Sequence, residues 1–172
     1  MLTSEHKWYA VYTRARWEKK VSKLFEEAGI EHYLPLYKTV RFWSDRKKTV
    51  VVPLFPSYVF VKTNLQEFFN VLNTPGVARI IKFEGKHVAV PEQQIEAIKL
   101  ILSEKIEFQT INIKPEPGDF LEIEKGALRG KKGELIEYRG KKKIAIRLDA
   151  IEKSIIINIP LSYIKIIQKA DE

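Results

Sequence analysis

The pattern of apolar and polar positions changes period several times along the first hundred residues. Residues 6–13 are rich in aromatic and β-branched side chains, which predicts a β-strand. Residues 18–28 then carry Val21, Leu24, Phe25 and Ala28 at helical spacing with charged residues between them. This spacing predicts an amphipathic helix that ends at Gly29 and packs one face on a core.

A hairpin with a basic tip is predicted next. Two extended runs, 36–43 and 49–52, flank a polar turn that contains Arg46, Lys47 and Lys48. The segments that follow predict a strand at 58–61, a short helix with the apolar stripe Leu65, Phe68, Phe69 and Leu72, strands at 77–83 and 87–90, and a helix opened by Pro91. The expected order is β-α-β-β-β-α-β-β-α.

The pattern weakens over residues 103–116, and the segment that ends in Pro117 and Gly118 suits neither a helix nor a central strand. Beyond it, β-prone runs of a few residues recur, separated by turns that contain glycine. These features predict an α+β chain with an N-terminal domain over 1–103, a linker over 104–116 and a small β-barrel domain over 117–172.

The amino-acid composition limits the classes of partner and of binding site that this chain can have. The chain has 172 residues and a net charge of +8, which favours polyanions or acidic protein surfaces. Residues 1–103 hold 16 basic and 10 acidic side chains, so most of the surplus lies in the first domain. The chain has no cysteine, which excludes disulfides and thiolate metal sites, and no apolar run reaches the length of a membrane span. A cytoplasmic protein that does not enter a membrane is expected.

Catalytic signatures are missing from the sequence. His6, His32 and His87 lie far apart, and none has the neighbour at i+3 or i+4 that a compact metal motif needs, so surface or packing roles are expected. No nucleophile elbow, phosphate-binding loop or zinc-hydrolase string occurs. A metal-dependent nuclease would need clustered carboxylates, and the sequence shows no such cluster. We therefore expect a binding protein without enzymatic activity or cofactor.

Three motifs resemble one known family. The chain contains KWYAVY at 7–12, PLFPSYVFV at 53–61 and TPGV at 74–77 followed by VP at 90–91. In the last domain, GD at 118–119 and EKGALRGKKGEL at 124–135 resemble a KOW motif. In this order, the motifs resemble those of the NusG-type transcription elongation and antitermination factors over nearly the whole chain.

The resemblance implies an N-terminal domain of the NusG type, called NGN: a four-stranded antiparallel sheet with flanking helices. It also implies a C-terminal KOW-type β-barrel. Members of this family dock the NGN domain on the clamp helices of RNA polymerase, and an apolar groove with aromatic walls suits a helix. Phe55 and Tyr58 match the groove residues, with Trp8, Tyr9 and Pro56 as supports. The alternative is that these aromatic side chains are core, because strands bury one face by default.

Ser57 stands where the general elongation factors of this family usually carry glycine. Several specialised paralogues also lack glycine there, so the departure favours a specialised paralogue. Serine is expected to be tolerated, on the view that a strand entrance need not require positive φ.

The resemblance also places the first domain beside the non-template DNA strand. Arg14 and Arg16 match basic positions of that contact, and Trp17 offers a base a stacking surface. The tip residues Arg46, Lys47 and Lys48 are expected to reach duplex phosphates, with solvated charge as the alternative for each basic residue.

In the KOW-type domain, Gly126, Gly130 and Gly133 are expected to serve backbone geometry. Three apolar residues, Leu128, Ile144 and Ile146, are candidate contacts for a further partner on an exposed face of the barrel, with core packing as the alternative. The partners that the resemblance implies are a small-subunit ribosomal protein, a termination factor or RNA.

The expected function is that of a monomeric transcription elongation and antitermination factor. It binds the polymerase clamp beside the transcription bubble and favours processive elongation, while its KOW domain recruits a partner. The alternative is a KOW-type RNA-binding or ribosome-associated protein that does not bind polymerase and relies on Lys131, Lys132 and the lysines at 141–143.

Overall fold

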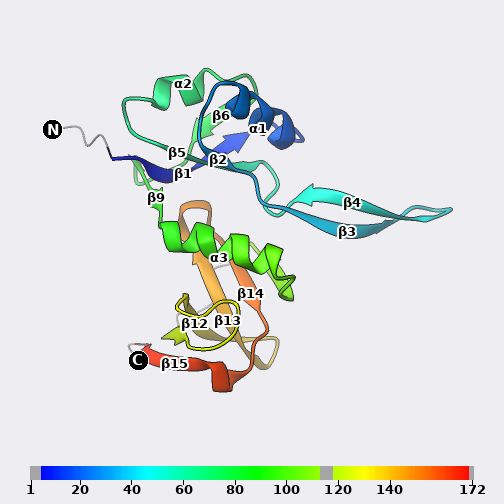
Figure 1. The fold of residues 1–172 in the computed structure, drawn as a ribbon, viewed down its shortest axis with the longest axis vertical. Coiled ribbons are helices and arrows are strands. Elements are labelled where there is room, and N and C mark those ends of the chain that lie inside the picture. Colours follow the sequence, from blue (N-terminus) through cyan, green and yellow to red (C-terminus); the bar gives the residue numbers. More distant parts are fainter. Residues whose placement is uncertain (1–4, 113–117, 171–172) are drawn as a thin grey trace. The chain divides into compact units, whose positions relative to one another are not determined.

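The computed structural model describes residues 5–112 and 118–170. They form two compact units, Met1–Pro91 and Glu92–Glu172 (Figure 1). The predicted first domain extends to residue 103 and the predicted linker to 116. In the structure, the helix after Pro91 groups with the second unit, and residues 113–116 of the predicted linker lie outside the described residues.

The first unit is built around an antiparallel sheet whose central strand is β1 (Lys7–Thr13). The strand order is β2-β5-β1-β6, with β9 pairing a further part of β1. These strands are β2 (His32–Tyr33), β5 (Tyr58–Thr63), β6 (Val77–Ile80) and β9 (Ala89–Val90). Four of the five were predicted as extended runs, whereas β2 has only two residues and gave no pattern.

Two helices pack on one face of this sheet: α1 (Glu18–Glu27) and α2 (Phe68–Leu72). Because successive residues of a strand point to opposite faces, Tyr9 and Val11 of β1 join Val59 and Val61 of β5 beneath the helices. The other members of this core are Val21, Phe25, Phe68, Val71 and Ile80. Of the apolar face predicted for α1, Val21 and Phe25 are buried and Leu24 is half-buried, whereas Ala28, just after the end of the helix, is exposed.

The apolar face predicted for the second helix was partly wrong. Phe68 is buried as expected, but Leu65, Phe69 and Leu72 are exposed and Val71 is buried in their place. The helix begins at Phe68 because Asn64 and the following residues form a turn, in which Asn64 Oδ1 accepts hydrogen bonds from the N–H groups of Gln66 and Glu67.

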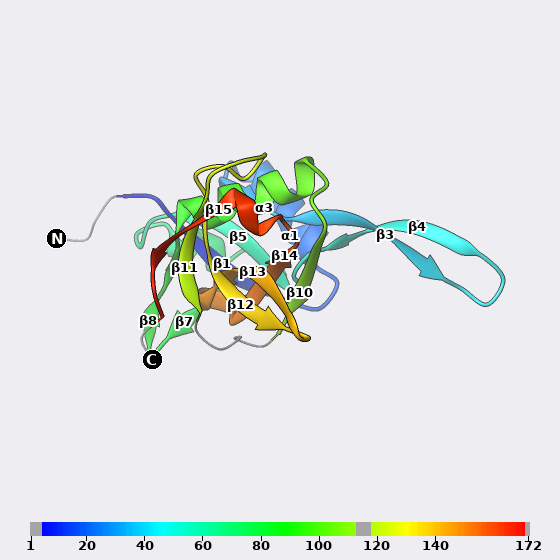
Figure 2. The same cartoon turned by 90° about the horizontal axis from the view of Figure 1, so that it is seen from below.

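Two hairpins extend from the sheet segments of this unit. Strands β3 (Leu36–Phe42) and β4 (Lys47–Pro53) pair only with each other among the described strands, as do β7 (Lys82–Phe83) and β8 (Lys86–His87). The β3–β4 hairpin reaches away from the rest of its unit in both views (Figures 1 and 2). Its existence and basic tip agree with the sequence prediction.

The second unit contains α3 (Glu92–Ser103) and a six-stranded antiparallel sheet in the order β10-β14-β13-β12-β11-β15. The strands are β10 (Phe108–Ile111), β11 (Asp119–Ile123), β12 (Lys132–Tyr138), β13 (Lys141–Leu148), β14 (Lys153–Ile157) and β15 (Ile164–Gln168). Short 3₁₀ turns over Asp149–Ile151 and Leu161–Tyr163 precede β14 and β15. Strand β10 lies within the predicted linker and pairs with β14 from Phe108 to Ile111.

The predicted α+β fold class is confirmed: two large antiparallel sheets, two two-stranded hairpins and three α-helices make up the described chain. No helix within residues 5–112 and 118–170 is long and apolar enough to cross a membrane.

Candidate functional site

A tight turn at 55–58 fixes the entrance to β5. The N–H of Tyr58 donates to the carbonyl of Phe55 at 3.1 Å, with Pro56 at the second position and Ser57 at the third. Ser57 has a φ of +67°, which together with the proline is the signature of a type II turn. The expectation that serine sits here without positive φ was wrong, because the turn places its third residue in the left-handed region.

The same turn is tied to two other elements. The N–H of Ser57 donates a hydrogen bond to Glu18 Oε1 at 2.6 Å. The carbonyl of Ser57 accepts a hydrogen bond from the N–H of Thr13 at 2.9 Å. Glu18 is itself buried at the start of α1. The turn, the end of β1 and the start of α1 therefore form one hydrogen-bonded unit that holds Pro56 and Tyr58 in place.

The predicted polymerase-binding aromatics divide between the two faces of the sheet. Tyr9 lies in the core beneath the helices, where its ring meets Phe68 edge-on at 4.9 Å. Trp8 points to the opposite face, the one that also receives Phe60 and Tyr58. Tyr9 therefore supports the helix side and does not share the face of Tyr58, which corrects its placement in one groove with Trp8.

Burial separates these residues further. Phe55 is only 1% exposed and packs edge-on against Phe60 at 6.2 Å, and Trp8 is also buried. Pro56 is exposed and Tyr58 half-buried. The core alternative thus describes Phe55, Trp8 and Tyr9 in this structure, and the accessible part of the predicted set is Pro56 with Tyr58.

Two residues outside the predicted set join Tyr58 in a row across three strands. Tyr12 is the β1 partner of Tyr58, and their rings meet edge-on at 5.3 Å. Arg79 of β6 pairs with Tyr12 and places its guanidinium carbon 4.4 Å from the tyrosine ring centroid. Strand alternation places Tyr12 on the face of Trp8, but the pairing of β1 with both β5 and β6 could not be read from the sequence.

The predicted DNA-binding residues after β1 lie beside this row in the chain. Arg14 and Arg16 are exposed. Trp17 is half-buried and packs on the helix-side core, with Arg14 at 5.7 Å and Lys20 Nζ at 4.1 Å from its ring. Two cationic side chains thus lie beside the ring on which a base would stack, and the two arginines are the exposed part of this set.

Because Gly76 has no side chain, the ring of Trp17 can lie close to the backbone at this position. A Cβ atom at Gly76 would lie 2.4 Å from Trp17 Cε3, and its φ is +92°. The carbonyl of Gly76 also accepts a hydrogen bond from the N–H of Arg14 at 2.8 Å. The motif at 74–77 therefore positions the basic segment that follows β1.

The predicted partner-binding residues of the second unit are corrected. Leu128, Ile144 and Ile146 are buried, at 1–2% exposure, so they do not form an exposed face. The pleat places Ile144 opposite Ile157 and Ile146 opposite Ile155, which are themselves buried. The alternation of side chains along a strand predicted that Ile144 and Ile146 share one face. The sequence did not show that this face is buried.

The three glycines of the KOW-like motif occupy positions where the backbone geometry favours glycine, as expected. Gly126 and Gly130 both have a φ of +82°. At Gly133, a Cβ atom would lie 3.0 Å from the carbonyl oxygen of Ala145 on the paired strand β13. The first two positions use positive φ, and the third allows close approach of two strands.

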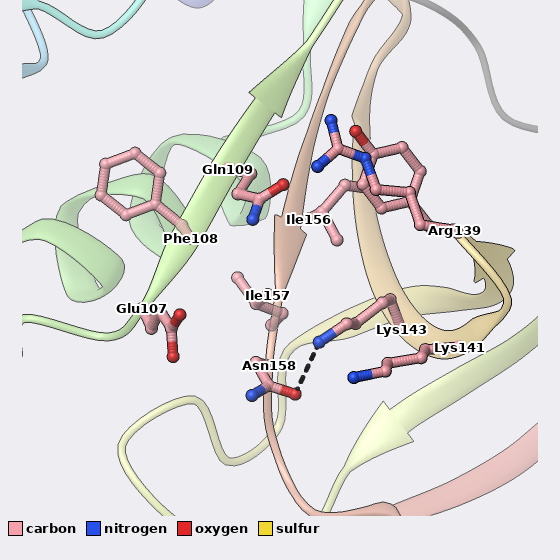
Figure 3. A pocket seen from close by; sticks show the side chains of 10 residues that line it. Glu107, Phe108, Gln109, Arg139, Lys141, Lys143, Ile156, Ile157 and Asn158 are labelled. Carbon is pink, nitrogen blue, oxygen red and sulfur yellow. Dashed lines mark hydrogen bonds between the residues drawn. The ribbon is translucent and has the colours of Figure 1, made fainter.

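A pocket of about 250 Å³ opens in the second unit between β10, the β12–β13 turn and the end of β14 (Figure 3). Lys143 Nζ donates to Asn158 Oδ1 at 3.0 Å, and Lys141 lies beside it (Figure 3). Tyr138 contributes an aromatic wall, with the Arg139 guanidinium carbon 5.2 Å from its ring centroid. Cationic side chains beside an aromatic ring suit an anion that carries a flat group.

The histidines occupy packing and surface positions. Nε2 of His32 faces Ser22 Oγ at 2.8 Å and its Nδ1 faces the Ile30 carbonyl at 2.9 Å, whereas His6 forms an exposed pair with Glu67. Burial, together with the charge of Lys82, lowers the pKa of His87. Within the described parts of the chain, no three His, Asp or Glu side chains come together as a metal site.

Comparison with known proteins finds the same family. A family model described as "Transcription termination factor nusG" matches residues 6–99. The match covers the whole first sheet, both motifs around Ser57 and Gly76, and most of α3.

Relatives extend the similarity to the second unit. The "Transcription termination/antitermination protein NusG" of Staphylococcus aureus strain Mu50 is 25% identical, over 92% of this chain and 94% of its own. A solved structure titled "Domain interaction in Thermotoga maritima NusG" is 23% identical, covers 95% of this chain and 98% of its own, and has a TM-score of 0.48. A second solved structure, titled "Crystal Structure of MjSpt4:Spt5 complex conformation A", is 18% identical, covers 95% of this chain and 99% of its own, and has a TM-score of 0.33.

Proposed function

Because this chain belongs to the NusG family of transcription termination and antitermination factors, we propose that it binds the clamp helices of RNA polymerase beside the transcription bubble and favours processive elongation. It acts by binding, without a chemical step. The residues proposed for polymerase contact are Pro56 and Tyr58, now joined by Tyr12 and Arg79.

The observation that supports this surface best is the row formed by Tyr58, Tyr12 and Arg79. Tyr58 and Tyr12 are half-buried and Arg79 is exposed. Tyrosine and arginine are the residue types that most often dominate protein interfaces, because each combines a large flat contact area with a polar end. The hydrogen-bonded turn at 55–58 makes this surface rigid, which lowers the entropy cost of binding.

The test is capture of core RNA polymerase by the immobilised full-length chain. Tyr58→Ala and Arg79→Ala should each weaken capture by about tenfold or more, the usual loss at an interface hot spot. Phe69→Ala is the matched control, because Phe69 is 73% exposed on α2, outside this row. Far-UV circular dichroism must show that each variant is folded. Equal capture by all variants, or no capture by the wild type, would overturn the proposal.

Contact with the non-template DNA strand is proposed for Arg14 and Arg16. Both side chains are exposed, and the hydrogen bond between Arg14 N–H and Gly76 fixes the backbone from which they extend. Phosphate contacts of this kind add affinity that is strongly salt-dependent. Arg14→Gln and Arg16→Gln should therefore weaken crosslinking to the non-template strand of a reconstituted elongation complex while polymerase capture persists.

A second candidate function is supported by the pocket in the second unit. We infer that the KOW-type domain recruits its partner, a ribosomal protein, a termination factor or RNA, through surface residues other than the buried Leu128, Ile144 and Ile146. RNA binding without polymerase is the alternative function. Lys141 and Lys143 line the pocket, whereas Lys131 is paired with Glu96 Oε2 at 2.5 Å.

This alternative makes a distinct prediction. Replacing Lys141, Lys142 and Lys143 with glutamine should abolish binding of a structured RNA if the pocket is its site, and should leave polymerase capture unchanged. If the wild type binds structured RNA tightly and fails to capture polymerase, the alternative replaces the leading proposal.

A further inference from the structure

The pocket of the second unit lies at the end of the sheet where β12 turns into β13 (Figure 3). Lys141 and Lys143 are two residues apart on β13, so they point to the same face, and Tyr138 of β12 is the partner of Lys141. Gln109 of β10 joins this face, because its partner Ile156 on β14 pairs with the residue two after Lys143. Four strands therefore build the pocket.

Positive charge gathers in this pocket. Three cationic side chains, those of Arg139, Lys141 and Lys143, line it together with one carboxylate, that of Glu107. Lys143 donates a hydrogen bond to Asn158, and Lys141 lies beside it (Figure 3). Within the parts of the chain that the structure describes, no carboxylate forms an ion pair with either lysine. Two neighbouring ammonium groups repel each other, and an anion with more than one negative charge stabilises both.

The other lining groups suit a flat ligand with polar edges. Tyr138 is half-buried and packs on a small buried cluster that includes Ile156, so its ring is held in place. The guanidinium carbon of Arg139 lies 5.2 Å from the centroid of this ring. Aromatic rings and guanidinium planes both stack on nucleobases. The side-chain amides of Gln109 and Asn158 each offer donors and an acceptor, which match the polar edge of a base.

The size of the pocket limits the ligand to one nucleotide. Its volume of about 250 Å³ lies just below the roughly 300–1,000 Å³ of pockets that hold drug-sized ligands. We propose that this pocket binds a free nucleoside diphosphate, with the base against Tyr138 and Arg139 and the phosphates on Lys141 and Lys143. An anion without a ring would use the lysines and leave the aromatic wall and the two amides without a role.

This inference goes beyond the proposed function and does not depend on polymerase binding. It gives the second unit a soluble small-molecule ligand, whereas the alternative function described above gives the same pocket RNA. Both ligands contain a base and a phosphate, so the test must compare a free nucleotide with a nucleotide chain.

Isothermal titration calorimetry of the full-length chain tests the two parts of the ligand separately. ADP should bind at least about tenfold more tightly than adenosine, which has no phosphate, and than pyrophosphate, which has no base; each part contributes binding free energy of its own. Pyrophosphate that binds as tightly as ADP would show attraction between charges alone and overturn the inference. A single-stranded oligoribonucleotide should bind more weakly than ADP, and the reverse order would favour the RNA alternative.

The lysines of β13 contain their own matched control. Alternation points Lys142 to the opposite face of the sheet, where Glu137 is its partner in the register. Lys141→Gln and Lys143→Gln should each weaken ADP binding about tenfold, the usual loss of a hydrogen bond to a charged group. Lys142→Gln removes the same charge from the same strand and should leave the affinity nearly unchanged. Equal losses in all three variants would show attraction to net charge and overturn the site.

Variants of Tyr138 test the place of the base. Tyr138→Leu should lower the affinity for ADP toward that for pyrophosphate and leave pyrophosphate binding unchanged, because only the base stacks on the ring. Tyr138→Phe keeps the ring and should bind ADP like the wild type, which separates stacking from packing of the strand. Far-UV circular dichroism must show that each variant is folded. Unchanged ADP affinity in folded Tyr138→Leu would contradict stacking at this position.

Nuclear magnetic resonance of the wild type locates the ligand without any substitution. On addition of ADP, the side-chain amide signals of Gln109 and Asn158 and the backbone signal of Gly140, in the β12–β13 turn, should shift more than signals of the first unit. Largest shifts in the first unit would place the nucleotide elsewhere and overturn the site. Polymerase capture by Lys143→Gln should equal that of the wild type, so failure of this inference is distinguishable from failure of the proposed polymerase contact.

Discussion

Ser57 holds a backbone conformation that glycine adopts at lower cost. Its φ of +67° disfavours a residue with a Cβ by about 1–2 kcal/mol, whereas glycine loses about 0.5–1 kcal/mol more conformational entropy on folding. The strain is the larger effect, so Ser57→Gly should raise the free energy of unfolding by about 0.5–1 kcal/mol. Urea unfolding followed by tryptophan fluorescence measures this, because all three tryptophans lie in the first unit.

Ser57→Ala is the control for this prediction. Alanine keeps the Cβ and therefore the strain, and it removes only the hydroxyl group, so the free energy of unfolding should change little. If Ser57→Gly is neutral or destabilising, the serine side chain contributes more than the backbone conformation costs, and the turn does not store strain.

Substitution of Gly76 tests how much close packing against Trp17 adds to the free-energy cost of a left-handed backbone conformation. Gly76→Ala should destabilise the first unit by more than 2 kcal/mol, on the order of a left-handed backbone cost plus overpacking against Trp17. Gly85→Ala is the matched variant, because Gly85 has a φ of +78° but nothing within 4 Å of a Cβ atom. It should cost only about 1 kcal/mol in the same urea experiment. Equal losses of stability at the two positions would mean that Trp17 simply moves.

For single residues, the sequence indicated which segments matter better than it indicated whether each side chain is buried. The motif at 53–61 correctly predicted the strand that begins at Tyr58, but nothing in the sequence indicated that Tyr9 and Tyr58 would lie on opposite faces. Burial of Phe55 and Ile144 depends on what packs over them, and that is decided by segments distant in the chain. The exposure of Phe42 and Trp43 in the hairpin was not predicted for the same reason.

Among the elements, β12 and β13 are joined by an ion pair with little access to water. Arg147 Nε donates to Glu134 Oε2 at 2.7 Å, and the two side chains are 14% and 10% exposed. Removing one partner of a buried pair leaves an uncompensated charge, so Arg147→Met should destabilise the second unit by about 2–4 kcal/mol. Far-UV circular dichroism during urea unfolding is the measurement, because this unit has no tryptophan.

The double variant Glu134→Met/Arg147→Met separates charge burial from packing. It should recover most of the stability that Arg147→Met loses, because two apolar side chains need no partner. A double variant as unstable as the single one would show that the pair acts through its shape and not through its charges.

Elements with a strong period were predictable, and short ones were not. Helix α1 and the hairpin strands β3 and β4 follow from their patterns, as does the series of strands after Gly118. Strand β2 has two residues, too few to show any period, and β10 is a strand only because it pairs with β14. Pairing with a distant partner is a tertiary effect that local propensity does not contain.

At the scale of the whole molecule, charge is divided unequally between the units. The unit Met1–Pro91 carries 15 basic and 8 acidic side chains, and Glu92–Glu172 carries 15 and 14. The hairpin over 36–53 contributes more than half of the surplus of the first unit. Long-range attraction to a polyanion therefore acts mainly on the unit that holds the proposed polymerase and DNA contacts.

The dependence of stability on pH should also differ between the units. The pKa of His87 lies below its ordinary value of 6.5 because of burial and the charge of Lys82. The neutral histidine therefore favours the folded state. This contribution is complete above pH 6.5 and is lost as the pH falls toward the folded-state pKa. His87→Phe, which keeps a ring beside Phe68, should flatten this part of the stability profile.

In the second unit the sensitive group is Asp119 at the start of β11. A hydrogen bond from the N–H of Ala170, with a smaller effect of Lys169, holds its pKa below the ordinary value of 3.8. The ionised carboxylate thus stabilises the end of β15, and this stabilisation is lost only as the pH falls below 3.8. Tryptophan fluorescence at graded pH should therefore report loss of stability in the first unit at a higher pH than hydrogen exchange at β15 reports local opening. Asp119→Asn should open β15 already at neutral pH, and equal exchange in the two proteins would show that this carboxylate does not hold the strand.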